Sequence, residues 1–100
     1  MVPTLRPGDR LYVDPAAYRS SAPAPGEVVV VHDPELPSRW LVKRVALPPG
    51  PAELSASTVF LLGDDPAASR DSRSFGPVPR SLVVGRVYRC YAPPERRREL

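Results

Sequence analysis

One lysine, Lys43, stands among aliphatic residues in the stretch WLVKRVAL. If this stretch is an extended strand, side chains two positions apart share a face. Lys43 then lies on the same face as three aliphatic residues, Leu41, Val45 and Leu47, with Arg44 on the other face. Apolar surroundings lower the pKa of a lysine from about 10.4, to roughly 5–6 in documented buried cases, and a lysine neutral at pH 7 can act as a general base. The alternative is a lysine whose stem packs on its neighbours while the ammonium stays in water.

A lysine base needs a nucleophile, and a serine hydroxyl paired with a lysine is one known arrangement. The chain offers several serines: Ser20, Ser21, Ser38, Ser55, Ser57, Ser69, Ser72, Ser74 and Ser81. None of them lies in a turn that would obviously expose it. The residue types alone therefore leave the nucleophile unassigned.

Further polar residues gather in the stretch from Gly63 to Pro79, which has no usable periodicity. An irregular stretch of this length in a small domain is more often functional than not. Its hydrogen-bonding residues are Asp64, Asp65, Ser69, Asp71, Ser72, Arg73 and Ser74. The alternative is a polar surface loop that its own Asp–Arg pairs hold in shape.

The elements that must position these residues are expected to be short strands. The chain has 100 residues, 42% hydrophobic and 25% charged, which suits one globular domain. Its 15 prolines exclude long helices and confine strands to short runs between turns. We therefore expect an all-β fold, with one helical turn at most, at residues 15–20. The expected strands are residues 10–14, 27–32, 39–47, 58–62 and 82–91.

Charge and composition exclude several kinds of site. Much of the net charge of +3 lies in the last five residues, RRREL, which we interpret as the end of a frayed basic tail at residues 93–100. A single cysteine, Cys90, excludes an internal disulfide, and a single histidine, His32, interpreted as a turn residue, excludes a Cys/His metal site. No cofactor is expected. Because no stretch approaches the ~20 apolar residues of a membrane-spanning helix and no signal peptide is present, the printed chain is expected to be soluble and cytoplasmic.

The chain resembles the bacterial type I signal peptidases in four stretches: MVPTLRPGD, PGEVVVV, LVKRVALPPG and LLGDDPAASRDSRSFGPVPRSLVVGRV. Those enzymes are membrane-associated serine proteases that use a Ser-Lys dyad. The resemblance implies a protease domain at residues 1–92 with a small, partly open β-barrel-like sheet and long irregular catalytic loops, a fold shared with the self-cleaving SOS-response repressors. The short link between the lysine and Gly-Asp stretches is most similar to small proteases proposed to mature nickel-containing superoxide dismutase.

The resemblance implies a role for each matching residue. Lys43 is the general base, and Ser69 orients its amine. Charge-assisted hydrogen bonds brace the site through Asp64, Asp71 and Arg73. Asp65 stands where asparagine is usual, which removes an amide donor. The stretch that follows the nucleophile, and that would line the active site, matches Met1, Pro3, Thr4 and Leu5.

In this family the nucleophilic serine immediately precedes the methionine that matches Met1, so the printed sequence begins one residue too late to contain it. The backbone amide of that serine, an expected oxyanion donor, is absent with it. We expect the true start to lie upstream; a genuine truncation and a deliberate fragment are the alternatives. As printed, the chain is expected to be inactive. An upstream extension that carried an anchor would make the protein membrane-associated.

The expected function is that of a serine endopeptidase that removes an N-terminal leader or propeptide. Its partner would be an extended peptide segment of a precursor protein, laid against an exposed strand. Maturation of nickel superoxide dismutase is a more specific alternative, and a non-catalytic peptide-binding domain is the alternative if Met1 is the true start. A self-cleaving repressor is disfavoured because the chain has no helical DNA-binding half. A nucleic-acid partner is disfavoured because aromatic residues do not alternate with the basic ones.

Overall fold

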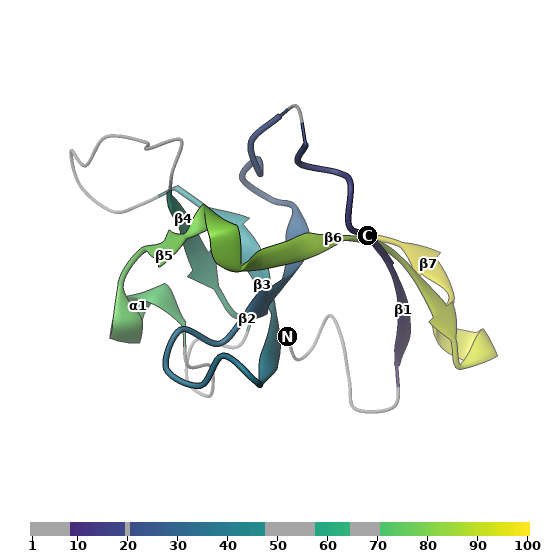
Figure 1. The fold of residues 1–100 in the computed structure, drawn as a ribbon. Helices are drawn as coiled ribbons and strands as arrows, with labels where there is room; N and C mark the ends of the chain where they lie inside the picture. Colours follow the sequence, from purple (N-terminus) through teal and green to yellow (C-terminus); the bar gives the residue numbers. More distant parts are fainter. Residues whose placement is uncertain (1–8, 20, 48–57, 65–70) are drawn as a thin grey trace.

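The computed structural model describes residues 9–19, 21–47, 58–64 and 71–100. Short strands dominate these ranges, and the helical elements are single turns (Figure 1). The strands are β1 (Arg10–Asp14), β2 (Val28–His32), β3 (Trp40–Ala46), β4 (Thr58–Leu62), β5 (Val78–Pro79), β6 (Val83–Ala92) and β7 (Arg98–Glu99). The helical turns are α1 (Ser72–Phe75), η1 (Arg80–Leu82) and η2 (Pro94–Arg96). Within the described ranges, no helix is long and apolar enough to cross a membrane.

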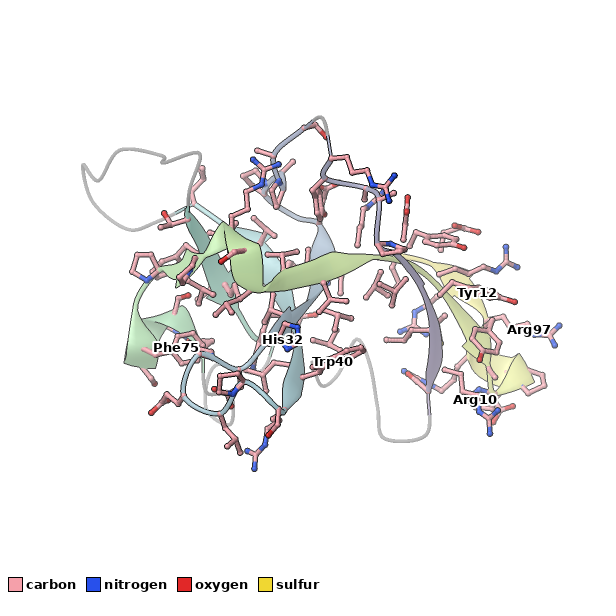
Figure 2. The ribbon with its side chains drawn as sticks, viewed as in Figure 1. Arg10, Tyr12, His32, Trp40, Phe75 and Arg97 are labelled. Carbon is pink, nitrogen blue, oxygen red and sulfur yellow. The ribbon has the colours of Figure 1, made fainter. Side chains whose placement is uncertain are left out.

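The strands form one antiparallel sheet in the order β1-β6-β2-β3-β4-β5, and β7 pairs with β6. Among the described residues β1 and β5 do not pair with each other, so the sheet is open and not a closed barrel. The predicted all-β fold with an open sheet is confirmed. Figure 2 shows Arg10 and Tyr12 of β1 at one end of the molecule and Phe75 of α1 at the other.

The central strand β2 is buried on both faces of the sheet. Val29 and Val31 belong to one apolar cluster, together with Val45, Val59, Leu61 and Val78. Val28 and Val30 belong to a second cluster, with Val87 on the other face. A strand covered on both faces reads as a continuous apolar run rather than an alternating one, which explains four successive valines.

The predicted strands agree with the observed ones to within one residue at each end. His32 is an exception in kind: it was expected in a turn, but it is the last residue of β2 and pairs with Trp40 of β3. The two rings meet edge to face, with centroids 5.8 Å apart, and Figure 2 shows them side by side. The two-residue strands β5 and β7 were not expected.

The prediction of a frayed tail is wrong, because residues 93–100 fold back on the sheet. β7 pairs with β6, and the Leu100 N–H donates to the Tyr88 carbonyl at 3.1 Å. Leu100 packs against the second apolar cluster. Arg96 Nε lies 2.7 Å from the Oδ1 of Asp9, whose side chain is only 3% exposed. These contacts tie the end of the described chain to its beginning; a domain limit at residue 92 stays a prediction.

Gly85 lets the end of β1 pass very close to β6. A Cβ built on Gly85 would lie 2.5 Å from the Asp14 carbonyl oxygen and 2.9 Å from the Pro15 Cα. These are backbone atoms that a side-chain rotation cannot move away. Glycine is therefore required at position 85, because the end of β1 passes too close to β6 for any side chain.

Candidate active site

Lys43 lies in the middle of β3, directly opposite Val29 of β2. It is 7% exposed, and its neighbours on the same face, Leu41 and Val45, both pack in the cluster around Val29. This burial matches the face assigned from the sequence and disfavours the alternative of a solvated ammonium. Leu47 does not share that environment, because it lies beyond the end of β3 and is 61% exposed.

The pairing of β3 with β4 brings the start of the irregular stretch next to Lys43. Arg44 pairs with Leu62 and Val45 with Leu61. Continuing this register by one pair places Gly63 opposite Lys43. The residue that opens the irregular stretch is thus positioned by strand pairing.

Asp71 fastens the far end of the irregular stretch to Gly63. The Gly63 N–H donates to Asp71 Oδ2 at 2.9 Å, and the Arg73 N–H donates to Oδ1 at 3.0 Å. The Arg73 guanidinium adds hydrogen bonds from Nε and Nη2. Burial of this carboxyl raises its pKa, but the hydrogen bonds from Arg73 and Gly63 outweigh burial and lower the pKa of Asp71 to about 2. Asp71 is therefore ionised at neutral pH.

Ser72 makes a second attachment to the same strand. Its Oγ accepts a hydrogen bond from the Leu61 N–H at 2.9 Å, and the residue is 3% exposed. Ser72 was considered as a nucleophile from the sequence, but this geometry gives it a structural contact instead. Asp71 and Ser72 together hold the N-terminus of α1 against β4.

Arg44 joins three segments around the lysine strand. Its guanidinium binds Asp64 through two hydrogen bonds of 3.0 Å, from Nε to Oδ1 and from Nη2 to Oδ2. Its Nη1 donates to the Gly26 carbonyl at 2.9 Å. The hydrogen bond with Asp64 is the main cause of the raised pKa of Arg44. Sequence reasoning assigned no role to Arg44, since nothing in the sequence links it to an acid twenty positions later.

The structure thus brings Asp71 and Arg73 together at the start of α1, where Asp71 also binds Gly63 at the end of β4. Asp64 instead binds Arg44, which points to the face of β3 opposite to Lys43. The catalytic role of Lys43 and the bracing roles of the two aspartates and Arg73 stay predictions. The remaining expected site residues lie outside the described ranges: Met1, Pro3, Thr4, Leu5, Asp65 and Ser69. Within those ranges, no group of three or more His, Cys, Asp or Glu side chains could hold a metal ion.

Comparison with known proteins identifies the family. The chain matches the family described as signal peptidase, peptidase S26, over residues 1–52 and 50–92. The match includes Lys43 and the whole irregular stretch. The chain belongs to the S26 signal peptidase family.

Three relatives illustrate how this S26 chain compares with longer proteins. It is 36% identical over 104 residues to the mitochondrial ATP-independent inner membrane protease subunit 1b of Arabidopsis thaliana, covering 87% of this chain and 62% of that protein. It is 34% identical over 112 residues to subunit 1a of the same plant, covering 95% and 67%. Signal peptidase I of Leptolyngbya laminosa is 26% identical over 138 residues, covering 100% and 68%. The chain therefore spans only about two thirds of the length of these relatives.

Proposed function

We propose that this chain is the catalytic domain of a serine endopeptidase that removes N-terminal leader or propeptide segments from precursor proteins. Membership of the S26 family supports the reaction class. The observation that carries the assignment is the burial of Lys43 on an apolar sheet face, 7% exposed between Leu41 and Val45. Such an environment favours the neutral amine that a general base requires.

In the proposed reaction, a serine immediately upstream of Met1 attacks the scissile carbonyl. The Nζ of neutral Lys43 takes the hydroxyl proton and passes it to the leaving amine, which departs as the peptide bond breaks. Water then attacks the acyl-enzyme ester, with the lysine again accepting the proton. Ser69 orients the amine, because a flexible lysine needs a partner to fix its direction.

The polar contacts around β4 support this arrangement by holding the strand next to the lysine. Asp71 receives the Gly63 N–H, and Ser72 receives the Leu61 N–H. Both bonds fix the end of β4, the strand that pairs with the strand carrying Lys43. A base held in one position accelerates proton transfer more than one that must first be ordered.

Two alternatives accompany the proposal, one more specific and one without catalysis. A dedicated role in maturing nickel superoxide dismutase stays a prediction, resting on the short link between the lysine and Gly-Asp stretches. A peptide-binding domain without catalysis is the reading if the native chain has no serine ahead of Met1.

Peptide mass spectrometry of the N-terminus in the native host tests the upstream serine. A peptide that reads through a serine into MVPTLRPGDR supports the dyad. A native chain that starts at Met1 or Val2 and binds leader peptides without cleaving them contradicts it and supports the peptide-binding alternative.

Lys43 is then tested in the native chain that contains the serine. Lys43→Ala is expected to lower the rate of leader cleavage at least about a thousandfold, because the base is lost. Lys43→Met, which retains an unbranched apolar side chain, should be as inactive, with a circular dichroism spectrum like that of the parent. Arg39→Ala, an exposed cation next to β3, serves as the control and should keep full activity. Cleavage by Lys43→Met at a rate near that of the parent would rule out the dyad.

A further inference from the structure

A pocket of about 400 Å³ opens between the end of β1 and the middle of β6. Its lining residues are Val13, Asp14, Pro15, Arg86 and Tyr88. None of them has a role in the proposed reaction. The close crossing at Gly85 brings Asp14 and Pro15 beside this part of β6.

Two residues of the pocket, Arg86 and Asp14, lie on the face of the sheet that carries Lys43. Pairing across the sheet aligns Lys43 with Val29, Val29 with Arg86, and Arg86 with Asp14. Directly opposite residues of antiparallel strands point to the same face. Neighbouring strands lie about 4.8 Å apart, so the backbone of Arg86 is roughly 10 Å from that of Lys43.

The guanidinium of Arg86 has unused donors. Its Nε lies 3.2 Å from Glu27 Oε2, yet it is buried and makes no hydrogen bond within the described residues. Glu27 Oε1 already accepts from the Tyr18 hydroxyl at 3.1 Å and the Ala24 N–H at 2.7 Å. Glu27 thus lies beside Arg86 without saturating its donors, and the side chain of Arg86 stays 39% exposed.

The other charged group of the pocket, Asp14, has a local structural role. Its Oδ1 accepts the Ala16 N–H at 2.9 Å and so shapes the turn after β1. The carboxylates beside Arg86, on Asp14 and Glu27, therefore already accept hydrogen bonds, whereas the guanidinium can still donate. A planar guanidinium with open donors matches a carboxylate in geometry and charge.

We propose that this pocket binds the carboxylate side chain of an aspartate or glutamate in an extended peptide, through Arg86. That the carboxylate comes from a substrate peptide rests on the proposed function, whereas the binding of the carboxylate does not.

The test measures binding by the chain as it exists. Two labelled decapeptides of alanine and serine, blocked at both ends, carry either one Glu or one Gln at the centre, and fluorescence polarisation gives the Kd of each. We expect the Glu peptide to bind about fivefold or more tightly than the Gln peptide, as one charge-assisted hydrogen bond implies. Arg86→Gln should abolish this difference, and Arg86→Lys should keep part of it. Equal affinity of the parent chain for the two peptides would overturn the proposal.

Two further variants separate the pocket from general charge. Arg89→Gln removes the same charge from the same strand, but at a residue paired with Glu99 outside the pocket, and should keep the preference for Glu. Asp14→Asn keeps an oxygen for the Ala16 N–H and removes a repelling charge, so it should tighten binding of the Glu peptide. If Asp14→Asn weakens binding of the Glu peptide instead, Asp14 does not repel the bound group and the proposal is wrong. A thermal unfolding curve of each variant checks that it is folded.

These outcomes are distinct from those of the proposed function. Peptide binding does not need the catalytic serine, so a chain that never cleaves can still show the preference for Glu. Equal binding of both peptides would overturn the proposed pocket but would not bear on the role of Lys43, which the cleavage assay of the Lys43 variants tests.

Discussion

At the scale of single residues, the charge of Asp71 links the stability of the site to pH. The carboxyl is fully buried and accepts hydrogen bonds from Gly63 and Arg73. Its pKa falls from 3.8 to about 2 in the folded chain. Because the folded state prefers the ionised form, this preference stabilises the fold above pH 4 and is lost as the pH falls toward 2.

Asp71→Asn should therefore lower the free energy of unfolding at pH 7 by about 2 kcal/mol or more, the value that follows from the pKa shift. Between pH 6 and pH 2.5, the parent should lose more stability than the variant, which lacks the titrating group. Urea unfolding followed by circular dichroism at both pH values measures this.

Glu99→Gln is the matched control for Asp71→Asn. Glu99 also pairs with an arginine, but its side chain is 72% exposed. A surface pair of this kind contributes less than about 1 kcal/mol. If Glu99→Gln and Asp71→Asn had the same effect at pH 7, the buried network would not have the stabilising role described above.

The environment of Lys43 could be predicted from residue alternation because one strand determines it. The contacts of Arg44 could not, since they depend on which strands pair and in what register. The predicted bracing residue Asp64 binds Arg44, twenty positions away, and the Gly26 carbonyl completes the contact. Residue alternation therefore predicted the buried face of Lys43, and the family resemblance named Asp64 as a site residue, but only the strand pairing reveals its partner Arg44.

At the scale of elements, the attachment of α1 to β4 depends on one serine hydroxyl. Ser72→Ala would leave the buried Leu61 N–H without an acceptor, which costs about 1–3 kcal/mol. Hydrogen exchange at the Leu61 amide should become faster, and the free energy of unfolding should fall. Ser74→Ala, an exposed position on the same turn, should change neither; protection of Leu61 that survives Ser72→Ala would contradict the assigned contact.

The crossing of β1 over β6 gives a second prediction at this scale. Gly85→Ala would place a methyl carbon 2.5 Å from the Asp14 carbonyl oxygen, so the strands must separate. We expect a loss of about 1–3 kcal/mol, typical of overpacking. Thermal and urea unfolding measure it. An alanine variant as stable as the parent would mean that β1 can shift without cost.

Element boundaries could be predicted where short apolar runs or alternating apolar residues lie between turn residues, as in β2, β3 and β6. The turn α1 and the strands β5 and β7 were missed because two to four residues carry no periodicity. β7 is a strand only because it pairs with β6. Its two charged residues, Arg98 and Glu99, by themselves indicate a solvent-exposed segment without regular structure. Charge composition thus led to the wrong prediction of a frayed tail.

At the scale of the whole molecule, the segment after β6 links the end of the described chain to its beginning. Removing residues 93–100 deletes the Arg96 ion pair with Asp9 and exposes the cluster that Leu100 covers. We expect a loss of about 2 kcal/mol or more in the free energy of unfolding, from a partly buried charge-assisted bond and an apolar side chain. Arg96→Gln should reproduce part of this loss, and Arg97→Gln, at an exposed position, little of it. A shortened chain as stable as the parent would mean that these contacts are not stabilising.

The pairing of β1 with β6 also has a consequence for synthesis on the ribosome. Asp14 of β1 meets Arg86, a residue made about 70 positions later. At a synthesis rate of roughly 5–20 residues per second, about 4–14 s pass between the synthesis of β1 and the synthesis of its partner on β6. During that interval the strand RLYVD has its aliphatic side chains exposed and its backbone unpaired, so the nascent chain is open to aggregation and to chaperone binding.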